Sequence, residues 1–402
     1  MTRKLHPVEF VGLMAVLMAT VAFSIDSMLP ALTDIAQELT PDNFNNVQLV
    51  LSSFMIGMGA GTLFTGPLSD WLGRKTVMLA GAAIYIAGAL LAWKAQTLEM
   101  LILGRALQGL GAAGPRVVAI AVIRDLYAGR DMARLVSVVM TVFTIFPALA
   151  PLLGSFIIAH GGWRGLFLAF FAFSALSSLW LALRLPESLP RERRQPFRLS
   201  GFRHAIIEMY SIPIVRVSIL VQIMVFSIMF TTISLIEPAF HQVFHRGEQF
   251  PYWFFGLGLM AASSSVVNAI FVGKYGMRKI VTLAMGVFMV ISLGMLTILG
   301  MGLSGNSLFY CFLVWQAAVY YQLGLTIGNL NALAMEPLGH IAGFAASVIG
   351  AISTVTAAVF STLVAQTFDG SILPQVLAST ALAAIAFLLM LHMQKLDRVR
   401  DI

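Results

Sequence analysis

The stretch of sequence that decides the fold lies between residues 66 and 75 and reads Gly66-Pro67-Leu68-Ser69-Asp70-Trp71-Leu72-Gly73-Arg74-Lys75. It gathers three charged side chains between two long apolar segments. Its two glycines allow the tight backbone turn that a short polar connection needs. Basic residues beside an apolar segment hold that end of it at the cytoplasmic face of a membrane. The stretch therefore predicts a charged hinge between two helices that span a membrane.

The composition excludes a soluble fold. Hydrophobic residues make up 59% of the chain and charged residues 11%, whereas soluble domains have about 45–50% and about 25%. A helix needs about 20 apolar residues to cross a bilayer, so the 402 residues leave room for about twelve spans and for no sizeable soluble domain. The apolar runs are continuous and do not alternate as the strands of a barrel would. The sequence predicts an all-α membrane protein.

Apolar segments that are long enough to span a membrane recur along the whole chain. They fall at residues 8–32, 44–67, 76–95, 98–122, 133–158, 163–184, 213–236, 251–272, 279–301, 307–330, 340–364 and 374–393. If the chain begins inside, twenty Lys and Arg residues fall on the cytoplasmic side and three, Lys94, Arg164 and Arg246, on the other. This bias predicts that both termini are cytoplasmic. It also accounts for the net charge of +7 without a nucleic-acid partner.

The spans divide into two halves around one long hydrophilic stretch. Residues 186–211 carry the charged run Arg191-Glu192-Arg193-Arg194 and are expected to form a cytoplasmic linker. A weak copy of the hinge, residues 273–279, follows the eighth span as residues 70–75 follow the second, although it lacks the aspartate. An internal repeat of this kind predicts two pseudo-symmetric six-helix bundles, residues 1–185 and 212–402.

Four patterns carry a resemblance to a known family. Residues 66–75 follow G-x-L-S-D-x-x-G-R-K, which resembles the signature loop between helices two and three of the major facilitator superfamily of transporters. Residues 105–113 follow R-x-x-Q-G-x-G-A-A and resemble a second motif of that family. Residues 26–32, D-x-x-L-P-A-L, and residues 329–347 resemble its Bcr/CflA branch of twelve-helix drug:proton antiporters.

The resemblance implies a secondary transporter that exports a small amphipathic drug or metabolite by alternating access, powered by protons. It implies a bacterial inner membrane, lipid, a small-molecule substrate and protons as partners, a monomer, and no cofactor beyond the proton gradient. It also implies that the hinge acts as a conformational latch, through Gly66, Asp70, Gly73, Arg74 and Lys75. An importer of a small nutrient or of copper with the same fold remains an alternative, and a membrane receptor a remote one.

Asp26 lies inside the first apolar segment. An acid that moves between an apolar setting and one beside a cation such as Arg105 takes up and releases a proton. The resemblance implies that Asp26 binds the proton or the substrate. Some relatives carry a second acid two turns earlier, where this chain has Met18. Asp26 then serves both the proton and a cationic substrate, or the substrate is neutral. Alternatively, Asp26 only caps the helix at the outer interface, with Asp34 beyond it.

Arg105 lies about a third of the way into the fourth span. A cation at this depth is costly unless it faces a polar cavity or a partner, which makes Arg105 a candidate cavity charge partner. Alternatively, its side chain snorkels to the membrane surface. The glycines that follow it, Gly109, Gly111 and Gly114, are expected to let neighbouring helices approach closely.

The fifth span contains Phe146-Pro147-Ala148-Leu149-Ala150-Pro151-Leu152-Leu153-Gly154-Ser155. It resembles the antiporter motif G-x-x-x-G-P-x-x-G-G, with Phe146, Ala150 and Ser155 in place of three glycines. Pro147 and Pro151 are expected to kink the helix, and Pro151 and Gly154 match the motif. The resemblance implies proton-driven export. The partial match leaves the direction of transport open, as does the alternative of a purely structural kink.

Aromatic and polar side chains of the second half are candidates for substrate binding, because aromatic rings bind apolar drugs with modest polar selection. The principal candidates are Phe226, Phe230, Trp315, Gln316, Tyr320 and Asn329, and Tyr252, Trp253 and Tyr321 are further ones. Each of them can equally be core or lipid-facing. The structural alternative for Asn329 is a hydrogen bond between helices.

Other classes of function find little support in the sequence. No H-E-x-x-H, G-x-S-x-G or paired-aspartate motif occurs within the spans, so an enzyme is not expected. The single cysteine, Cys311, excludes an internal disulfide and a cysteine-based metal cluster. Methionine thioethers bind Cu(I), and the chain has 22 methionines. Methionine is also a common filler of apolar helices, and no metal site is predicted.

Overall fold

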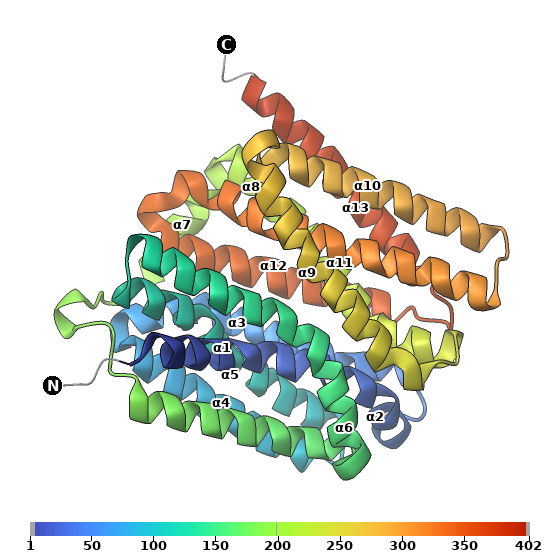
Figure 1. Cartoon of the computed structure of the whole chain (residues 1–402), viewed down its shortest axis with the longest axis horizontal. Helices are drawn as coiled ribbons and strands as arrows, with labels where there is room; N and C mark the ends of the chain where they lie inside the picture. The colour runs from blue at the N-terminus through green and yellow to red at the C-terminus, as the bar shows by residue number, and fades with distance from the viewer. Residues whose placement is uncertain (1–4, 198, 399–402) are drawn as a thin grey trace. The chain divides into compact units, whose positions relative to one another are not determined.

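The computed structural model describes residues 5–197 and 199–398 (Figure 1). Within these residues the chain forms helices joined by short connections, and no strand occurs. Four of the basic residues behind the predicted charge bias, Arg3, Lys4, Arg198 and Arg400, lie outside the described residues. The chain divides into two compact units, Met1–Phe202 and Arg203–Ile402. The boundary falls within the predicted linker.

The first unit is built from α1 (Pro7–Asp26), α2 (Leu32–Leu39), α3 (Leu49–Leu72), α4 (Arg74–Trp93), α5 (Leu98–Leu126) and α6 (Gly129–Arg184). Helix α7 (Leu199–Ser211) leads into the second unit. That unit contains α8 (Pro213–Pro238), α9 (Phe250–Tyr275), α10 (Met277–Gly300), α11 (Gly305–Met335), α12 (Ala342–Ala365) and α13 (Leu373–Arg398). Short 3₁₀ and π turns join them, including one over Glu336–Ile341 between α11 and α12.

The predicted number of crossings is recovered within the described residues. Ten helical stretches are long and apolar enough to span a membrane. Two of them, Gly129–Arg184 and Gly305–Ala365, are 56 and 61 residues long, which is enough for two crossings each. The first of these turns back at Gly162, where φ is 62°, and the second contains the turn between α11 and α12. Twelve spans result.

Glycines bring α5 close to both of its neighbours. A Cβ atom on Gly109 would overlap the backbone of Phe54 on α3, and one on Gly111 would overlap the backbones of Gly81 and Tyr85 on α4. Close approach of backbones replaces the hydrophobic driving force that helices lack inside a bilayer. The predicted role of these two glycines is confirmed. Gly114 has only ordinary van der Waals contacts, with nearest atoms at 3.5 Å or more.

Apolar side chains complete the core of each unit. In the first unit, Phe10, Leu13, Met14, Leu17 and Met18 of α1 pack with residues of α4, α5 and α6. In the second, α8 packs against α11, α12 and α13. Its core cluster includes the buried methionines Met285, Met390 and Met393, surrounded by valine, leucine and alanine. These thioethers fill an apolar core, and among the described residues no group of His, Cys, Asp or Glu forms a metal site.

The two halves repeat the same break in the same place. Helix α3 ends at Leu72 and α4 begins at Arg74, so only Gly73 (φ 104°, ψ 151°) interrupts them. Helix α9 ends at Tyr275 and α10 begins at Met277, with Gly276 (φ 78°, ψ 154°) between. Side chains with a Cβ are strained at such positive φ angles, which explains the glycine in both copies. The predicted hinge is therefore one residue wide, and Gly66 and Pro67 are helical.

Candidate functional site

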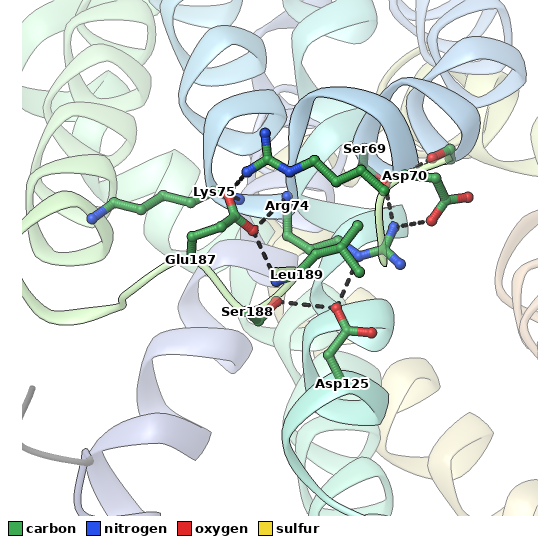
Figure 2. A network of polar contacts seen from close by, with 10 residues as sticks. Ser69, Asp70, Arg74, Lys75, Asp125, Glu187, Ser188 and Leu189 are labelled. Carbon is green, nitrogen blue, oxygen red and sulfur yellow. Dashed lines mark hydrogen bonds and ion pairs between the residues drawn. The ribbon is translucent and has the colours of Figure 1, made fainter. Parts of the chain in front are cut away.

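Arg74 organises the charged network at the hinge. Its guanidinium forms ion pairs with Asp70, at 2.6 Å, and with Asp125 at the end of α5, at 3.0 Å. It also donates a hydrogen bond to the hydroxyl of Ser69 at 2.6 Å. Figure 2 shows these partners on both sides of the arginine. Asp70 therefore pairs with Arg74 across the hinge between α3 and α4. Asp125 adds a connection to α5 that the sequence motif does not reveal.

Glu187 caps the N-terminus of α4 from the linker. Its carboxylate accepts hydrogen bonds from the backbone N–H groups of Arg74, at 2.8 Å, and Lys75, at 3.2 Å (Figure 2). The first N–H groups of a helix have no partner within the helix, and a carboxylate there also meets the positive end of the helix dipole. The backbone N–H of Leu189 donates to the same carboxylate at 3.2 Å, which fixes the local turn of the linker.

Further contacts fasten the linker to the hinge. The ammonium group of Lys75 donates to the backbone carbonyl of Ala182, near the end of α6 and just before the linker, at 2.6 Å. The hydroxyl of Ser188 donates to Asp125 at 3.1 Å, and the backbone N–H of Gln195 donates to the carbonyl of Asp70 at 3.1 Å. The hinge, the end of α5 and the linker segment 187–195 therefore form one polar assembly, which we call the hinge network.

Asp26 is the last residue of α1, and its side chain is buried, with 6% exposed. Its carboxylate has no hydrogen bond or ion pair to any described residue. The helix breaks immediately after it, because residues 29–31 form a 3₁₀ turn that contains Pro30. Burial argues against the alternative of an exposed cap at the interface.

Arg105 does not pair with Asp26 in this structure. Its guanidinium is fully buried and donates to the backbone carbonyls of Ser24, at 2.9 Å, and Val50, at 3.2 Å. It also donates to the side-chain oxygen of Gln108 at 3.0 Å and lies 4.4 Å from the ring centroid of Phe54. Full burial excludes the snorkelling alternative. Arg105 instead joins α1, α3 and α5 at the level of the Asp26 turn.

A second polar contact joins α1 to α4 beside the arginine. The hydroxyl groups of Ser24 and Tyr85 are 2.5 Å apart and share a hydrogen bond, and both side chains are buried. Ser24 also donates to the carbonyl of Thr20 at 2.6 Å. Buried polar groups are stable when they are hydrogen-bonded to one another. The segment just before Asp26 is therefore held from α4, through Tyr85, and from α5, through Arg105.

The antiporter-like motif of α6 packs directly against the turn at Asp26. A Cβ atom on Gly154 would overlap the backbone of Ser27, the residue after Asp26. Pro147 and Pro151 lie within the same helix on the approach to this contact. Phe146 packs edge-on against Phe23 of α1, with ring centroids 6.2 Å apart. Motifs that are more than a hundred residues apart in the sequence thus meet at one point.

Arg116 is a second arginine within α5 that the sequence reasoning did not single out. It lies eleven residues after Arg105, and its only hydrogen bond to a described residue goes to the thioether sulfur of Met58, at 3.6 Å. The same rule that selected Arg105, a charge within an apolar span, applies to it equally. The signal was present in the sequence.

The six principal substrate-binding candidates of the second unit are buried or half-buried, whereas the further candidate Tyr252 is exposed. Phe226 and Phe230 stack on each other with centroids 5.8 Å apart. The indole N–H of Trp315 donates to Ser292 at 2.9 Å, and Tyr320 packs edge-on against Phe254. Asn329 donates to Asn268 at 2.7 Å, which is the hydrogen bond between helices that was its alternative.

Gln316 differs from the other candidates. Its side chain is fully buried, and neither its amide oxygen nor its amide nitrogen has a hydrogen-bond partner among the described residues. A buried polar group without a partner is costly. Of the predicted set, this residue is therefore the strongest candidate for contact with a polar ligand.

A cavity of about 770 Å³ lies between α9, α10 and α11. Its walls are mostly apolar and include the polar side chains of Asn268, Lys279, Tyr321 and Gln322. None of the six principal substrate-binding candidates lines it, although Tyr321, which was also predicted, does. The six principal candidates pack between the helices of the unit instead of facing this cavity. Their roles in substrate binding remain predictions.

Comparison with known proteins decides the family. The family model described as Major Facilitator Superfamily matches residues 13–362. The chain belongs to the major facilitator superfamily. It is accordingly a membrane transporter and not an enzyme.

Curated relatives agree with the Bcr/CflA resemblance of this major facilitator. A bicyclomycin resistance protein homolog of Haemophilus influenzae is 25% identical over 384 residues, which cover 94% of each chain. The multidrug resistance protein MdtL of Klebsiella pneumoniae is 33% identical over 171 residues, which cover 42% of this chain and 43% of MdtL. The first similarity extends over nearly the whole chain, and the second is confined to part of it.

Solved structures confirm the fold of this major facilitator. The xylose transporter XylE of Escherichia coli, in a partially occluded inward-open conformation, matches with a TM-score of 0.76 at 13% identity. The match covers 97% of this chain and 99% of XylE. At this identity the likeness concerns the fold and does not extend to the substrate.

Proposed function

We propose that this chain is a proton-coupled transporter that exports a small amphipathic drug or metabolite by alternating access. Family membership supports the transport part of the proposal. The names of the relatives, bicyclomycin resistance and multidrug resistance, support a drug-like substrate and export. The proton gradient is the energy source and no cofactor takes part.

The observation that carries the proton part is the buried, unpartnered carboxylate of Asp26. An isolated charge in an apolar interior is unstable, so such a carboxylate needs a proton, a cation or water. Arg105 donates to three other oxygen acceptors, and neither a hydrogen bond nor an ion pair joins it to Asp26 in the described residues. In this state a proton is the simplest neutralising partner for Asp26. When the site opens to water on one side of the membrane, the carboxylate becomes stable as an anion and releases that proton.

The turn at Asp26 is built to respond to helix movement. Gly154 of α6 packs on the backbone of Ser27, so a shift of α6 along α1 has to displace the turn that follows Asp26. Breaks within membrane-spanning helices are a common site of binding in transporters. Proton binding at Asp26 and the position of α6 are thereby coupled in the proposed mechanism.

The hinge network is the proposed latch. Arg74 connects two carboxylates from different helices, and Glu187 attaches the linker to the start of α4. A set of contacts of this kind stabilises one conformation and has to rearrange in the other. We place it, with both termini, on the cytoplasmic side of a bacterial inner membrane, on the basis of the charge bias, and we propose that the protein acts as a monomer.

Ligand-induced proton release tests the proposal. The full chain in detergent, in a weakly buffered solution at mildly acidic pH, is mixed with bicyclomycin and with a panel of amphipathic drugs. We expect about one proton to be released per protein with each drug that binds. The variant Asp34→Asn, which removes an exposed carboxylate on α2, serves as the control and should release the same amount. A drug that binds without releasing a proton from either protein would contradict proton-coupled export of that drug.

A further inference from the structure

Arg116 is a cation within the membrane that lacks an anionic partner. No carboxylate of the described residues lies within ion-pairing distance of it. Its one hydrogen bond, to the sulfur of Met58 at 3.6 Å, uses a weak acceptor. A guanidinium has five N–H donors, so most of its capacity is unused.

The position of Arg116 on α5 is well inside the span. Helix α5 is 29 residues long, which corresponds to about 43 Å, and the apolar core of a bilayer is about 30 Å thick. Arg116 is eleven residues from Arg105, which corresponds to about 16 Å along the axis and about 20° around it. Both arginines therefore lie on one face of α5 and both fall within the apolar core.

The two arginines differ in how their charges are satisfied. Arg105 is held by three oxygen atoms and an aromatic ring. Arg116 has only the sulfur atom of Met58 as a hydrogen-bond acceptor among the described residues. Because Arg105 donates to Ser24, the carboxylate of Asp26 lies at the level of Arg105 and about three helical turns away from Arg116. Arg105 is thus fixed by its hydrogen bonds, whereas the half-buried Arg116 keeps most of its donors without a partner among the described residues.

Several other arginines of this unit are neutralised by nearby carboxylates. Arg164 pairs with Glu38 at 2.7 Å, and Arg184 pairs with Glu9 at 2.6 Å. Arg74 is shared by two carboxylates of the hinge network. The embedded part of the unit therefore holds two arginines against one acid, Asp26, and the surplus charge is positive whether or not Asp26 carries its proton.

We propose that Arg116 binds an anionic group of the transported substrate, so that the substrate class is amphipathic organic anions. A carboxylate, sulfonate or phosphate accepts two parallel hydrogen bonds from the planar guanidinium, which is the strongest pairing available to it. The same charge repels cationic drugs. The inference rests on the proposed transport function and adds the charge of its substrate. We therefore propose an anionic substrate instead of the cationic or neutral one that Asp26 alone suggests.

Three probes that share one aromatic body test the inference: 2-naphthoate, 2-naphthamide and 2-naphthylmethylammonium. Their binding to the full chain in detergent at neutral pH is measured by equilibrium dialysis. We expect naphthoate to bind about 10-fold more tightly than the amide, as a charge-assisted hydrogen bond provides, and the ammonium compound to bind most weakly. The measurement needs no proton gradient, so it is independent of the proton-release experiment.

Variants assign the preference to Arg116. Arg116→Gln is expected to lower naphthoate affinity about 10-fold and to leave amide affinity unchanged. Arg116→Lys should keep part of the preference, because it keeps the charge but not the planar pair of donors. Arg134→Gln removes an exposed arginine of α6 and should change neither affinity. If Arg116→Gln does not fold, the lysine variant decides.

The inference is overturned by any of four results. The wild type binds the amide or the ammonium compound as tightly as naphthoate, or it binds none of the probes. A folded Arg116→Gln keeps the full preference for naphthoate. The lysine variant binds naphthoate no better than the amide. If proton release on drug binding persists in any of these cases, the transport proposal stands and only the anionic substrate class is lost.

Discussion

The guanidinium of Arg105 donates a hydrogen bond to the backbone carbonyl of Ser24, 2.9 Å away and two residues before Asp26. The family motif of the fourth span and the acid of the first are thus connected through the backbone and not through an ion pair. The consequence is that Arg105 fixes the position of the Asp26 turn without neutralising the carboxylate. This leaves Asp26 available for the proton exchange that we propose.

Replacing Arg105 tests its structural role. Arg105→Lys keeps a positive charge but cannot reach Ser24, Val50 and Gln108 together, because an ammonium group lacks the planar set of donors. We expect it to lower the free energy of unfolding by about 1–3 kcal/mol, the usual range for buried groups left without partners. Thermal unfolding in detergent measures this. An unchanged melting temperature would contradict a structural role for the three hydrogen bonds.

The contact between α6 and the Asp26 turn is tested by a pair of glycines on one helix. Gly154→Ala puts a methyl group into the backbone of Ser27, which should destabilise the protein by about 1–3 kcal/mol and slow transport. The matched control is Gly161→Ala, at a position with no atom within 4 Å of the added methyl, which should do neither. Equal effects of the two substitutions on melting temperature would rule out a specific contact.

The cap that Glu187 provides is tested by proteolysis of the linker. Glu187→Ala removes the acceptor for the first N–H groups of α4, at an expected cost of about 1 kcal/mol. It also releases the linker, so trypsin should cut after Arg191 and Arg193 several-fold faster. Glu248→Ala, which removes an exposed glutamate outside the linker, is the control. Identical cleavage rates for both variants would show that Glu187 does not hold the linker.

A double-mutant cycle measures the ion pair at the centre of the hinge network. Arg74 and Asp125 are largely buried, with 11% and 18% of their side chains exposed. We expect a coupling energy of about 1 kcal/mol between Arg74→Ala and Asp125→Ala. The pair Arg184 and Glu9, with 49% and 25% of their side chains exposed, should give a smaller coupling energy because solvent screens it. A larger coupling for the exposed pair would argue against a latch at Arg74.

Most of the fold follows from the sequence because the bilayer limits the choices. Apolar runs of the required length predict the spans, and each helix satisfies its own backbone, so the pattern needs no tertiary information. The ends are less well predicted. Residues 66–72 read as a polar loop because of their charge and glycine, but they continue α3, since a helix extends beyond the apolar core wherever its side chains tolerate water.

The candidate site is predicted only in part, for two different reasons. Asp26, Arg105 and Arg74 stand out because charge is rare beside or within a span. Arg116 meets the same criterion and was missed because no motif contains it. Glu187 gives no signal at all, since it is one charge in a polar linker, and only the fold brings it to the start of α4. Trp315 illustrates the converse, because a tryptophan that binds a drug and one that packs in a core look alike in sequence.

The central claim, that Asp26 carries the coupled proton, is tested most directly in vesicles that contain the purified protein and a drug that binds it. Drug movement driven by an imposed pH gradient is compared between the wild type, Asp26→Asn and Asp34→Asn. We expect Asp26→Asn to abolish gradient-driven movement while it keeps the melting temperature of the wild type or raises it, because the amide is neutral without binding a proton. Asp34→Asn should transport normally. Gradient-driven transport that persists unchanged in Asp26→Asn would contradict the claim.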